Sequence, residues 1–372
     1  MRVALLGCVG VSLTQFRGRL IDAMVARGHE VVGCAADHDP RVVAELGARG
    51  ARFRQVPLDR TGLNPLRDMG SVLGLRRIFD ELRPDMLLAY TMKPMVYGAL
   101  AARLARVGRI FTMVEGMGYA FADGSEGRRR FLRAVQQPLY RLAFSLSNAT
   151  FVLNPDDRDL LRQRRLAPRR HELVLLNGIG IDLAHFAYAP PPVERPSFLL
   201  VGRLIRDKGV VAYAEAARRV KAEFPKARFA LLGSFESSPG ALAPEQVEAW
   251  QREGIIDYLG TVHDVRPVIR DANVFVLPST YREGVPRSTL EAMAMGRPII
   301  TTDAPGCRET VRHGENGYLV AKHDVEGLAA AMRRFAAAPG LALPMGLASR
   351  RLVEERFDDR EVNDAILETM QL

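Results

Sequence analysis

Hydrophobic positions in the first half of the chain fall into short apolar runs separated by longer amphipathic stretches. The apolar runs have the length of strands and lie at residues 3–7, 30–36, 85–91, 109–114 and 149–154. The amphipathic stretches have helical spacing and lie at residues 14–27, 69–82, 95–106 and 128–146. Strands that alternate with helices in this way predict a parallel sheet.

The same alternation starts again after a proline-rich segment. Residues 187–197 contain four prolines, which disfavour helix and strand alike and predict a linker. Further apolar runs follow at residues 198–202, 227–233, 257–260, 273–279 and 297–302. The sequence therefore predicts an α/β protein of two doubly wound, Rossmann-like domains.

Domain boundaries follow from the same pattern. We expect a first domain over residues 1–188, a linker over 189–197, a second domain over 198–356, and a final helix over 357–372 that packs back on the first domain. Ligands of doubly wound sheets bind beyond the carboxyl ends of the strands. Two such sheets that face each other would form one cleft.

Composition narrows the classes of function. The chain has 372 residues, 48% hydrophobic and 26% charged, as expected for globular domains. Cys8, Cys34 and Cys307 have neither metal-ligand nor disulfide spacing, and they suit a reducing compartment. No apolar run approaches the ~18 residues that span a bilayer. The apolar start at residues 3–7 is too short for a signal peptide, so we interpret it as a buried strand.

Positive charge is concentrated in the first half. Residues 1–190 contain 28 Lys and Arg against 18 Asp and Glu, whereas the remainder contains 24 against 25. Such a surface fits an anionic membrane, a phosphorylated substrate or ordinary solvation. The basic and aromatic strips typical of nucleic-acid binders do not stand out, so nucleic acid is not an expected partner.

The predicted helix at residues 128–146 combines five arginines with apolar residues at helical spacing. Pro138 would interrupt or kink it. One interpretation places this helix on an anionic membrane. The other packs its apolar side in the core and leaves a basic edge in solvent.

Two basic residues follow the first strand of the second domain. Arg203 and Lys208 come directly after the run 198–202, at the expected carboxyl edge of the sheet. An arginine can hold a diphosphate through two hydrogen bonds, and a lysine adds a point charge. Their function would be to stabilise a leaving group. Ordinary surface charge near a turn is the alternative.

The segment YREGVPRSTLEAMAMGRP (281–298) places two glutamates eight residues apart. Ser288 and Thr289 lie where a helix is predicted to begin, so their hydroxyls would cap it and its N–H groups would bind a phosphate. Glu283 precedes the helix and Glu291 lies on its predicted first turn, where both would accept hydrogen bonds from sugar hydroxyls. The alternative makes them a loop acid and a helix-terminal charge.

These residues and their order resemble retaining GT-B glycosyltransferases that carry the E-x7-E element, of the family 4 type. The matching pieces are Gly202-Arg203, Lys208, Glu283-Gly284, Glu291-Ala292 and Gly296-Arg297-Pro298. The resemblance implies that Glu283 contacts the donor sugar, Glu291 the nucleotide ribose, and Arg203 and Lys208 the diphosphate. It also implies retention, with a donor phosphate oxygen taking the proton of the attacking hydroxyl.

A narrower resemblance concerns the acceptor. Residues 93–105, 114–121, 139–157 and 282–310 are similar to enzymes that add an N-acetylhexosamine to a sugar on undecaprenyl diphosphate. The implied reaction moves a hexosamine, of GalNAc or GlcNAc type, from a UDP-sugar to a polyprenyl-diphosphate-linked sugar in bacterial glycan assembly. The implied location is cytoplasmic, peripheral on the inner face of the cell membrane. A UDP-sugar 2-epimerase of the same fold and a non-catalytic nucleotide-sugar-binding protein are the alternatives.

The glycine loop at residues 7–17 follows the first strand. Gly10 permits close approach of a ligand, and Ser12 would cap the next helix. The resemblance places this loop against the donor diphosphate or the acceptor, and Arg17 would pair with an acceptor phosphate. The implied acceptor-binding residues are Ser12, Arg17 and Lys93.

Glu115 departs from the resembled enzymes, which commonly have threonine there. We expect it to contact a sugar and group it with Glu283 as catalytic; an acid at a solvated strand end is the alternative. The implied donor-binding residues are Gly10, Arg203, Lys208, Val262, Glu283, Gly284, Val285, Pro286, Arg287, Ser288 and Glu291.

Neither a cofactor nor an essential metal is expected. The loop at residues 7–17 is not a GxGxxG, which argues against a nicotinamide site. Asp37-His38-Asp39 matches the DxD of a different glycosyltransferase fold, but it follows a strand of the first domain, and we interpret it as a loop. The seven histidines are scattered and form no metal-binding motif.

Overall fold

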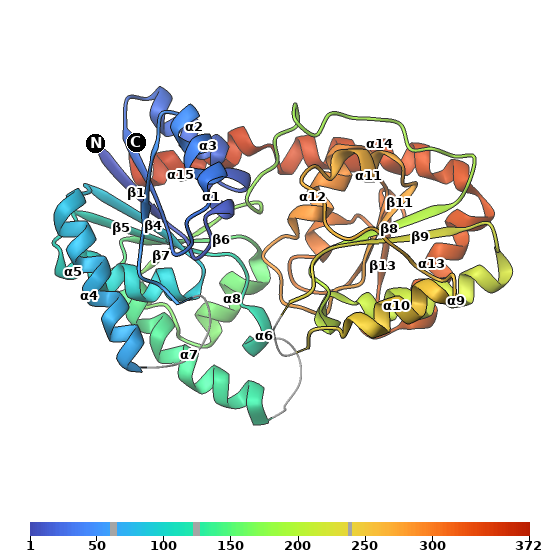
Figure 1. Cartoon of the computed structure of the whole chain (residues 1–372), viewed down its shortest axis with the longest axis horizontal. Coiled ribbons are helices and arrows are strands. Elements are labelled where there is room, and N and C mark those ends of the chain that lie inside the picture. Colours follow the sequence, from blue (N-terminus) through green and yellow to red (C-terminus); the bar gives the residue numbers. More distant parts are fainter. Residues whose placement is uncertain (60–64, 122–126, 237–239) are drawn as a thin grey trace. The chain divides into compact units, whose positions relative to one another are not determined.

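The computed structural model describes residues 1–59, 65–121, 127–236 and 240–372. It divides into two compact units (Figure 1): Met1–Ile179 together with Asp359–Leu372, and Gly180–Asp358. The boundary therefore lies before the proline-rich segment. Residues 189–196 belong to the second unit and contain neither helix nor strand.

A parallel sheet of seven strands forms the centre of the first unit, in the order β3-β2-β1-β4-β5-β6-β7. Its strands are β1 (Arg2–Leu6), β2 (Glu30–Ala35), β3 (Arg52–Gln55), β4 (Met86–Tyr90), β5 (Arg109–Val114), β6 (Ala149–Val152) and β7 (Glu172–Leu175). Every strand predicted for this half is confirmed. The edge strands β3 and β7 were not predicted. β3 is short and lacks an apolar run, whereas β7 has a short run, Leu173–Leu175, that is only partly buried.

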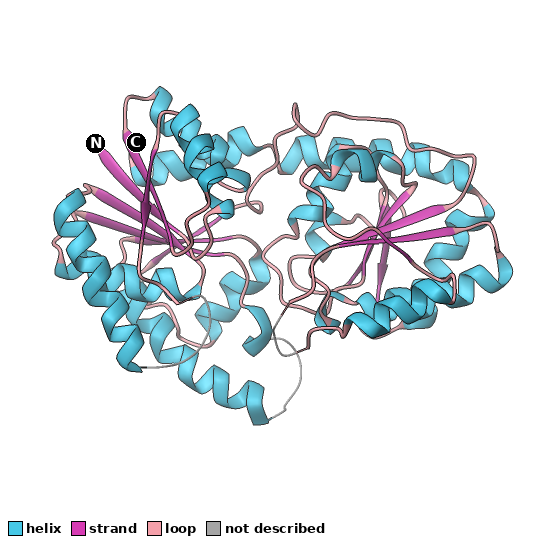
Figure 2. Cartoon of the chain, viewed as in Figure 1, coloured by secondary structure: helices cyan, strands magenta, loops and turns pink. Residues whose placement is uncertain are grey.

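Helices cover both faces of this sheet (Figure 2). Alternate residues of β1 enter separate cores, Val3 and Leu5 on one face and Ala4 and Leu6 on the other. The first face carries α1 (Val11–Gln15), α2 (Gly18–Ala26), α3 (Pro40–Ala48) and α15 (Asp359–Met370). The second carries α4 (Pro65–Leu82), the π-helix η1 (Pro94–Gly98), α5 (Ala99–Leu104), α6 (Gly118–Phe121), α7 (Gly127–Leu146) and α8 (Pro155–Gln163).

Two helix predictions were wrong in detail. The stretch 14–27 forms two helices, because the chain leaves helical geometry at Arg17, which precedes α2. Of the interruption or kink predicted at Pro138, the interruption is wrong, because α7 continues from Gly127 to Leu146. Pro138 is exposed, so the carbonyl that loses its hydrogen bond to the proline lies near solvent.

The second unit has a six-stranded parallel sheet in the order β10-β9-β8-β11-β12-β13. Its strands are β8 (Ser197–Val201), β9 (Arg228–Leu232), β10 (Asp257–Tyr258), β11 (Val274–Leu277), β12 (Ile299–Thr302) and β13 (Gly317–Val320). The helices are α9 (Val210–Glu223), α10 (Pro244–Arg252), α11 (Arg266–Arg270), α12 (Arg287–Ala294), α13 (Val325–Ala337) and α14 (Ala342–Arg356). Only β13 was not predicted, and the α/β class is confirmed.

A buried arginine fastens the proline-rich segment to the second unit. The Arg297 guanidinium donates to the carbonyls of Ala272 (2.8 Å), Met295 (2.9 Å) and Arg270 (3.1 Å), and also to that of Ala189. Burial lowers the pKa of Arg297 to about 10. Backbone carbonyls replace the water that this charge loses, so the segment is held as part of the unit.

A polar chain crosses the interior of the first unit. Thr112 Oγ1 lies 2.7 Å from Thr150 Oγ1, which lies 2.8 Å from His171 Nε2. The His171 ring also stacks on Phe144 at 5.7 Å. Burial, with a smaller effect of Arg162, lowers the pKa of His171 to about 4, so the folded protein favours the neutral ring.

We expect acid to destabilise the first unit through His171. Its folded pKa lies below the unfolded value, so its contribution is complete above about pH 6.5 and is lost as the pH falls toward 4. After allowance for solvent screening, the loss at pH 5.5 should be about 1 kcal/mol. Urea unfolding at pH 7.5 and 5.5 measures it. In His171→Gln the free energy of unfolding should change less between these two pH values. An equal change in both proteins would show that His171 does not cause the acid sensitivity.

Candidate functional site

An ion pair joins two loops at the carboxyl edge of the second sheet. Lys208 ends a short 3-10 turn (Arg206–Lys208) after β8, and Glu283 lies between β11 and α12. Lys208 Nζ lies 2.6 Å from Glu283 Oε1, and the two side chains are only 12% and 11% exposed. Ser279 Oγ donates to the same oxygen at 2.9 Å. Sequence analysis predicted both charges but not their pairing or Ser279.

Close backbone contacts fix these two loops. The N–H groups of Thr280 and Tyr281 donate to the carbonyl of Asp207 at 2.8 and 3.0 Å. Gly209 has φ 78° and lies against the carbonyl of Pro278, where a Cβ would overlap it. The ion pair is therefore held by backbone as well as by charge.

The second glutamate pairs within its own helix. Arg287 Nε donates to Glu291 Oε1 at 2.9 Å, one helical turn apart. Burial raises the pKa of Glu291, and the charge of Arg287 opposes that rise. Glu291 lies on the second turn of α12 rather than the first, because the helix begins at Arg287.

The predicted hydroxyl cap of α12 was wrong. The residue that precedes the helix is Pro286, and no side chain caps it. Thr289 is fully buried, and among the described residues its hydroxyl has no hydrogen-bond partner. Ser288 is half-buried. No side chain therefore caps the first turn, and the Thr289 N–H donates to the Pro286 carbonyl at 3.1 Å.

The remaining donor residues predicted in this unit vary in exposure. The Arg203 guanidinium lies 5.8 Å from the centre of the Tyr281 ring, a partner that the sequence did not identify. Gly284, Val285 and Pro286 are buried beside Glu283. Val262 lies in the loop after β10 and is exposed. The side chains that meet in pairs are Lys208 with Glu283 and Arg287 with Glu291.

The glycine loop of the first unit is built around Tyr90, at the end of β4. Ser12 Oγ donates to the carbonyl of Val9 at 2.6 Å and lies 2.9 Å from Tyr90 Oη. A Cβ at Gly7 would overlap the tyrosine ring. Ser12 does not cap the next helix as predicted, because α1 begins at Val11 and already contains it.

The DxD segment is a loop, as predicted, and supports the glycine loop. Asp37 Oδ1 accepts a hydrogen bond from the Gly10 N–H at 2.7 Å. Asp39 caps α3 through the N–H of Arg41. Within the residues that the structure describes, no three His, Cys, Asp or Glu side chains form a possible metal site.

Arg17 and Glu115 form an ion pair beneath this loop. Arg17 is 2% exposed, its guanidinium carbon lies 4.8 Å from the centre of the Tyr90 ring, and Nη2 contacts the Met113 sulfur at 2.9 Å. Burial raises the pKa of Glu115, and Arg17 opposes that rise. Glu115 is 20% exposed, so it is not the solvated acid of the alternative interpretation.

Lys93 lies apart from this pair. Its ammonium is 3.0 Å from Asp68 Oδ1 of α4, and both side chains are largely buried. The ring of Tyr97 lies 5.9 Å from the same nitrogen. Lys93 therefore links the start of η1 to α4.

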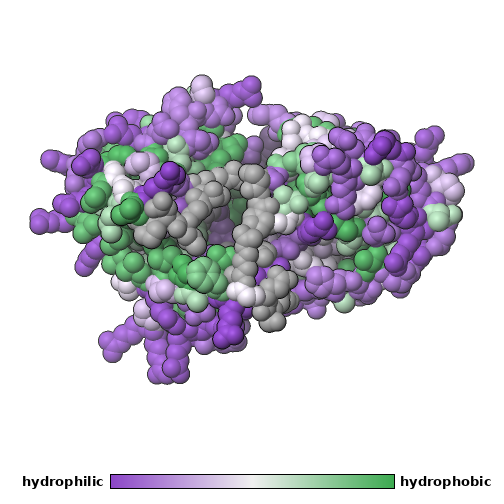
Figure 3. Space-filling model, turned by 60° about the horizontal axis from the view of Figure 1, so that its bottom comes forward, coloured by the Kyte–Doolittle hydropathy of each residue, from purple (hydrophilic) through white to green (hydrophobic). Residues whose placement is uncertain are grey.

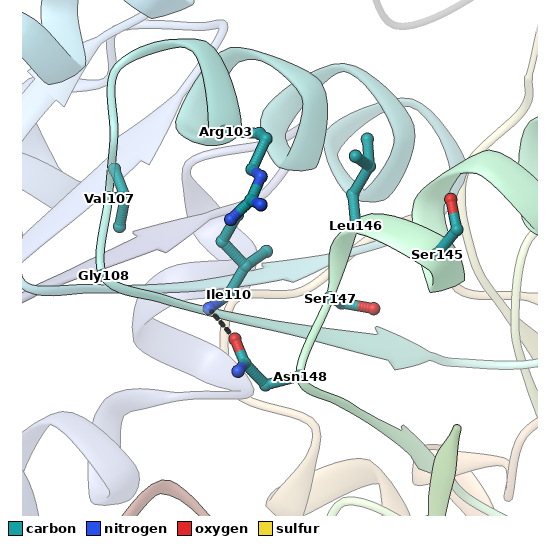
Figure 4. Close-up of a pocket in the computed structure, with 8 residues that line it drawn as sticks. All are labelled: Arg103, Val107, Gly108, Ile110, Ser145, Leu146, Ser147 and Asn148. Carbon is teal, nitrogen blue, oxygen red and sulfur yellow. Dashed lines mark hydrogen bonds between the residues drawn. The ribbon is translucent and has the colours of Figure 1, made fainter. Parts of the chain in front are cut away.

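A shallow cavity of about 280 Å³ lies at the opposite, amino-terminal edge of the first sheet (Figure 4). Arg103, Ser145, Ser147 and Asn148 contribute its polar lining. The Asn148 side chain accepts the N–H of Ile110 at 2.8 Å. The residues of the glycine loop and of the Arg17–Glu115 pair do not line it.

Comparison with known families finds a match in each half of the chain. The family described as "Glycosyl transferase 4-like domain" matches residues 13–178, and the family "Glycosyl transferases group 1" matches residues 195–338. The two matches follow the two units of the structure.

Two curated relatives carry informative names. The N,N'-diacetylbacillosaminyl-diphospho-undecaprenol alpha-1,3-N-acetylgalactosaminyltransferase of Campylobacter jejuni is 28% identical over 85% of this chain and 84% of its own. The UDP-Gal:alpha-D-GlcNAc-diphosphoundecaprenol alpha-1,3-galactosyltransferase of Escherichia coli is 26% identical over 75% of this chain and 73% of its own.

Solved structures share the fold. The sucrose-phosphate synthase of Thermosynechococcus elongatus has a TM-score of 0.80 at 18% identity, over 100% of this chain and 98% of its own. Anabaena HepE in complex with UDP and glucose has a TM-score of 0.78 at 19% identity, over 100% and 99%. Both support the two-domain GT-B fold.

We expect the Arg17–Glu115 pair to show strong coupling. Arg17→Met should destabilise the first unit by about 2–3 kcal/mol, because Glu115 keeps a charge with little solvent and no partner. Glu115→Gln should lower the free energy of unfolding by less. The double variant should be more stable than the sum of the two single losses predicts. Urea unfolding of the four proteins measures the coupling. Strictly additive losses would show that the two charges do not stabilise each other.

Proposed function

Since the chain belongs to the group 1 glycosyl transferases, with a glycosyl transferase 4-like first unit, we propose that it transfers a hexosamine from a UDP-sugar to a sugar on a polyprenyl diphosphate. The protein is a glycosyltransferase. The names of the C. jejuni and E. coli relatives, which both specify a diphospho-undecaprenol acceptor, support the acceptor class. The N-acetylgalactosaminyl group in the first name supports a hexosamine of GalNAc or GlcNAc type.

The Lys208–Glu283 pair carries the proposal for the donor. Its two charges differ in what they can bind: the ammonium attracts a diphosphate, and the carboxylate accepts hydrogen bonds from sugar hydroxyls. We assign Lys208, with Arg203, to the leaving diphosphate and Glu283 to the transferred sugar. The positive dipole end of α12, which no side chain caps, adds to phosphate binding.

Glu291 fits the nucleotide ribose. It is largely buried, and Arg287 opposes the effect of burial on its pKa. A carboxylate in this state still has lone pairs for two ribose hydroxyls. We keep the proposal of retention, in which a donor phosphate oxygen takes the proton of the attacking hydroxyl. Neither a metal nor a cofactor takes part in this scheme.

In the first unit we propose that Glu115 accepts a hydrogen bond from a sugar hydroxyl. Arg17 then acts through Glu115, because its guanidinium is buried and already pairs with that carboxylate. This replaces the predicted contact between Arg17 and an acceptor phosphate. Ser12 and Lys93 keep their proposed places near the acceptor.

The proposed place of action is the inner, cytoplasmic face of the cell membrane, because the acceptor is a lipid. Among the described residues, no helix is long and apolar enough to cross a bilayer. The proposed attachment is peripheral. The basic first half supports contact with anionic lipid.

We expect UDP release to depend on both substrates. Among UDP-sugars, one hexosamine donor should give release only when an undecaprenyl-diphosphate-linked sugar is supplied in detergent. EDTA should leave the rate unchanged. Conversion of the UDP-sugar to its C2 epimer without net UDP release would favour the 2-epimerase alternative, and donor binding without turnover in any condition would favour a nucleotide-sugar sensor.

We expect Glu283→Gln to reduce kcat at least a hundredfold, because the amide lacks the charge that orients the sugar and pairs with Lys208. Steady-state UDP release measures it. Glu326→Gln is the matched control, since Glu326 is an exposed acid of α13 that also pairs with arginines. Equal activity of the two variants would remove Glu283 from the proposed site.

A further inference from the structure

Helix α7 has an apolar stripe on each side. The inner stripe enters the core of the first unit and includes Tyr140, Ala143 and Phe144, with Leu132 and Leu139 packed against them. The outer stripe is exposed and comprises Phe131, Ala134, Pro138 and Leu142. Phe131 is 63% exposed. Core packing explains the first stripe and leaves the second without a function in the fold.

The charges on this helix all have one sign. Residues 127–146 contain Arg128, Arg129, Arg130, Arg133 and Arg141 and no Asp or Glu. A helix that is both outwardly apolar and uniformly basic differs from an ordinary solvated helix, which mixes both signs. A second copy of the chain would oppose the same positive charges, so self-association through this face is unfavourable.

Helix α4 continues the apolar surface. Leu66, Met69 and Leu73 lie on one side of its first turns at spacings of three and four residues. Leu66 is 86% exposed and Met69 56%. The acid nearest to this stripe, Asp68, points to Lys93 and is neutralised by it. Apart from Met1, the most exposed large apolar side chains of the described residues are Leu66, Phe131 and Met69, which lie on α4 and α7.

Both helices cover the same face of the first sheet. Helix α5 and the π-helix η1 each contact α4 and α7. Figure 1 shows the first turns of α4 and α7 toward the same end of the unit. Figure 3 views the molecule from that side, and the first unit presents a broad apolar area with hydrophilic side chains along its border.

We propose that the exposed stripes of α4 (Leu66, Met69, Leu73) and α7 (Phe131, Ala134, Pro138, Leu142) form the surface that docks the first unit on an anionic phospholipid bilayer. The apolar side chains enter the boundary between headgroups and acyl chains, and the exposed Arg130 and Arg141 of α7 bind lipid phosphates. This rests on the proposed function, because only a lipid-linked acceptor requires the enzyme at a membrane.

Vesicle co-sedimentation tests the surface without donor or acceptor. The full chain should bind vesicles of phosphatidylcholine with phosphatidylglycerol and bind vesicles of phosphatidylcholine alone at least fivefold more weakly. Leu66→Ser with Phe131→Ser should weaken binding to the anionic vesicles at least tenfold. Arg130→Gln should weaken it severalfold, and 0.5 M salt should do the same to the unaltered chain.

Leu343→Ser with Leu347→Ser is the matched control, because these exposed leucines lie on α14 of the second unit. It should bind vesicles as the unaltered chain does. Equal binding by the α4/α7 variant, or no preference for anionic vesicles, would overturn the proposal. A change of oligomeric state in that variant would instead identify a contact between copies.

Activity separates this proposal from the assigned reaction. With the acceptor dissolved in detergent, the α4/α7 variant should release UDP at the rate of the unaltered chain, and with the acceptor embedded in anionic vesicles it should be at least fivefold slower. An equal loss in both conditions would place the defect in the site rather than at the bilayer. If neither the unaltered chain nor the variant releases UDP, the proposed reaction is wrong. Vesicle binding then still tests the proposed docking surface.

Discussion

The structure depends on the rule that a charge removed from water must keep a partner. Lys208 with Glu283, and Arg17 with Glu115, are each largely buried, and each joins segments far apart in sequence. Removing one member leaves the other charge buried and unpaired. The resulting loss of stability is far larger than the net stability that the intact pair contributes. The pairs therefore fix the loops at the carboxyl ends of β8, β11 and β5. Arg297 shows the same rule with carbonyls in place of a carboxylate.

A pair of this kind is also poised for exchange with a ligand. Lys208 and Glu283 neutralise each other in the structure described here, and a nucleotide-sugar would offer a phosphate to the first and hydroxyls to the second. In the proposed donor complex, each charge would exchange one partner for another without an unpaired state in water. Ser279 would hold the carboxylate meanwhile, since its hydroxyl donates to Glu283. The loops do not need to be reorganised, because Gly209 and the Asp207 carbonyl fix them independently.

Sequence pattern was sufficient for the parallel sheets and for the kind of residue at their edges. Apolar runs identify strands that are buried on both faces, and the carboxyl ends of such strands meet at one edge, so Arg203, Lys208 and Glu283 were expected there. The short, partly buried strand β3 carries no such run, and that of β7 is only three residues long. Pairing was not predictable, because Arg17 and Glu115 are 98 residues apart and only the sheet order brings them together. The caps assigned to Ser12 and Ser288 failed because helix boundaries shift by a residue or two without changing the pattern.

The outer face of α7 shows what periodicity cannot separate. Phe131, Leu132, Leu139, Leu142 and Phe144 all follow helical spacing, and the sequence left open whether they serve the core or a membrane. The fold assigns Leu132, Leu139 and Phe144 to the core, and leaves Phe131 and Leu142 exposed. The core interpretation therefore accounts for one side of the helix, and the other side is the one proposed to contact the membrane. A helix fixed to the sheet by one stripe presents the other at a constant orientation, which is what an enzyme needs if its acceptor sugar is held at a set height above a bilayer.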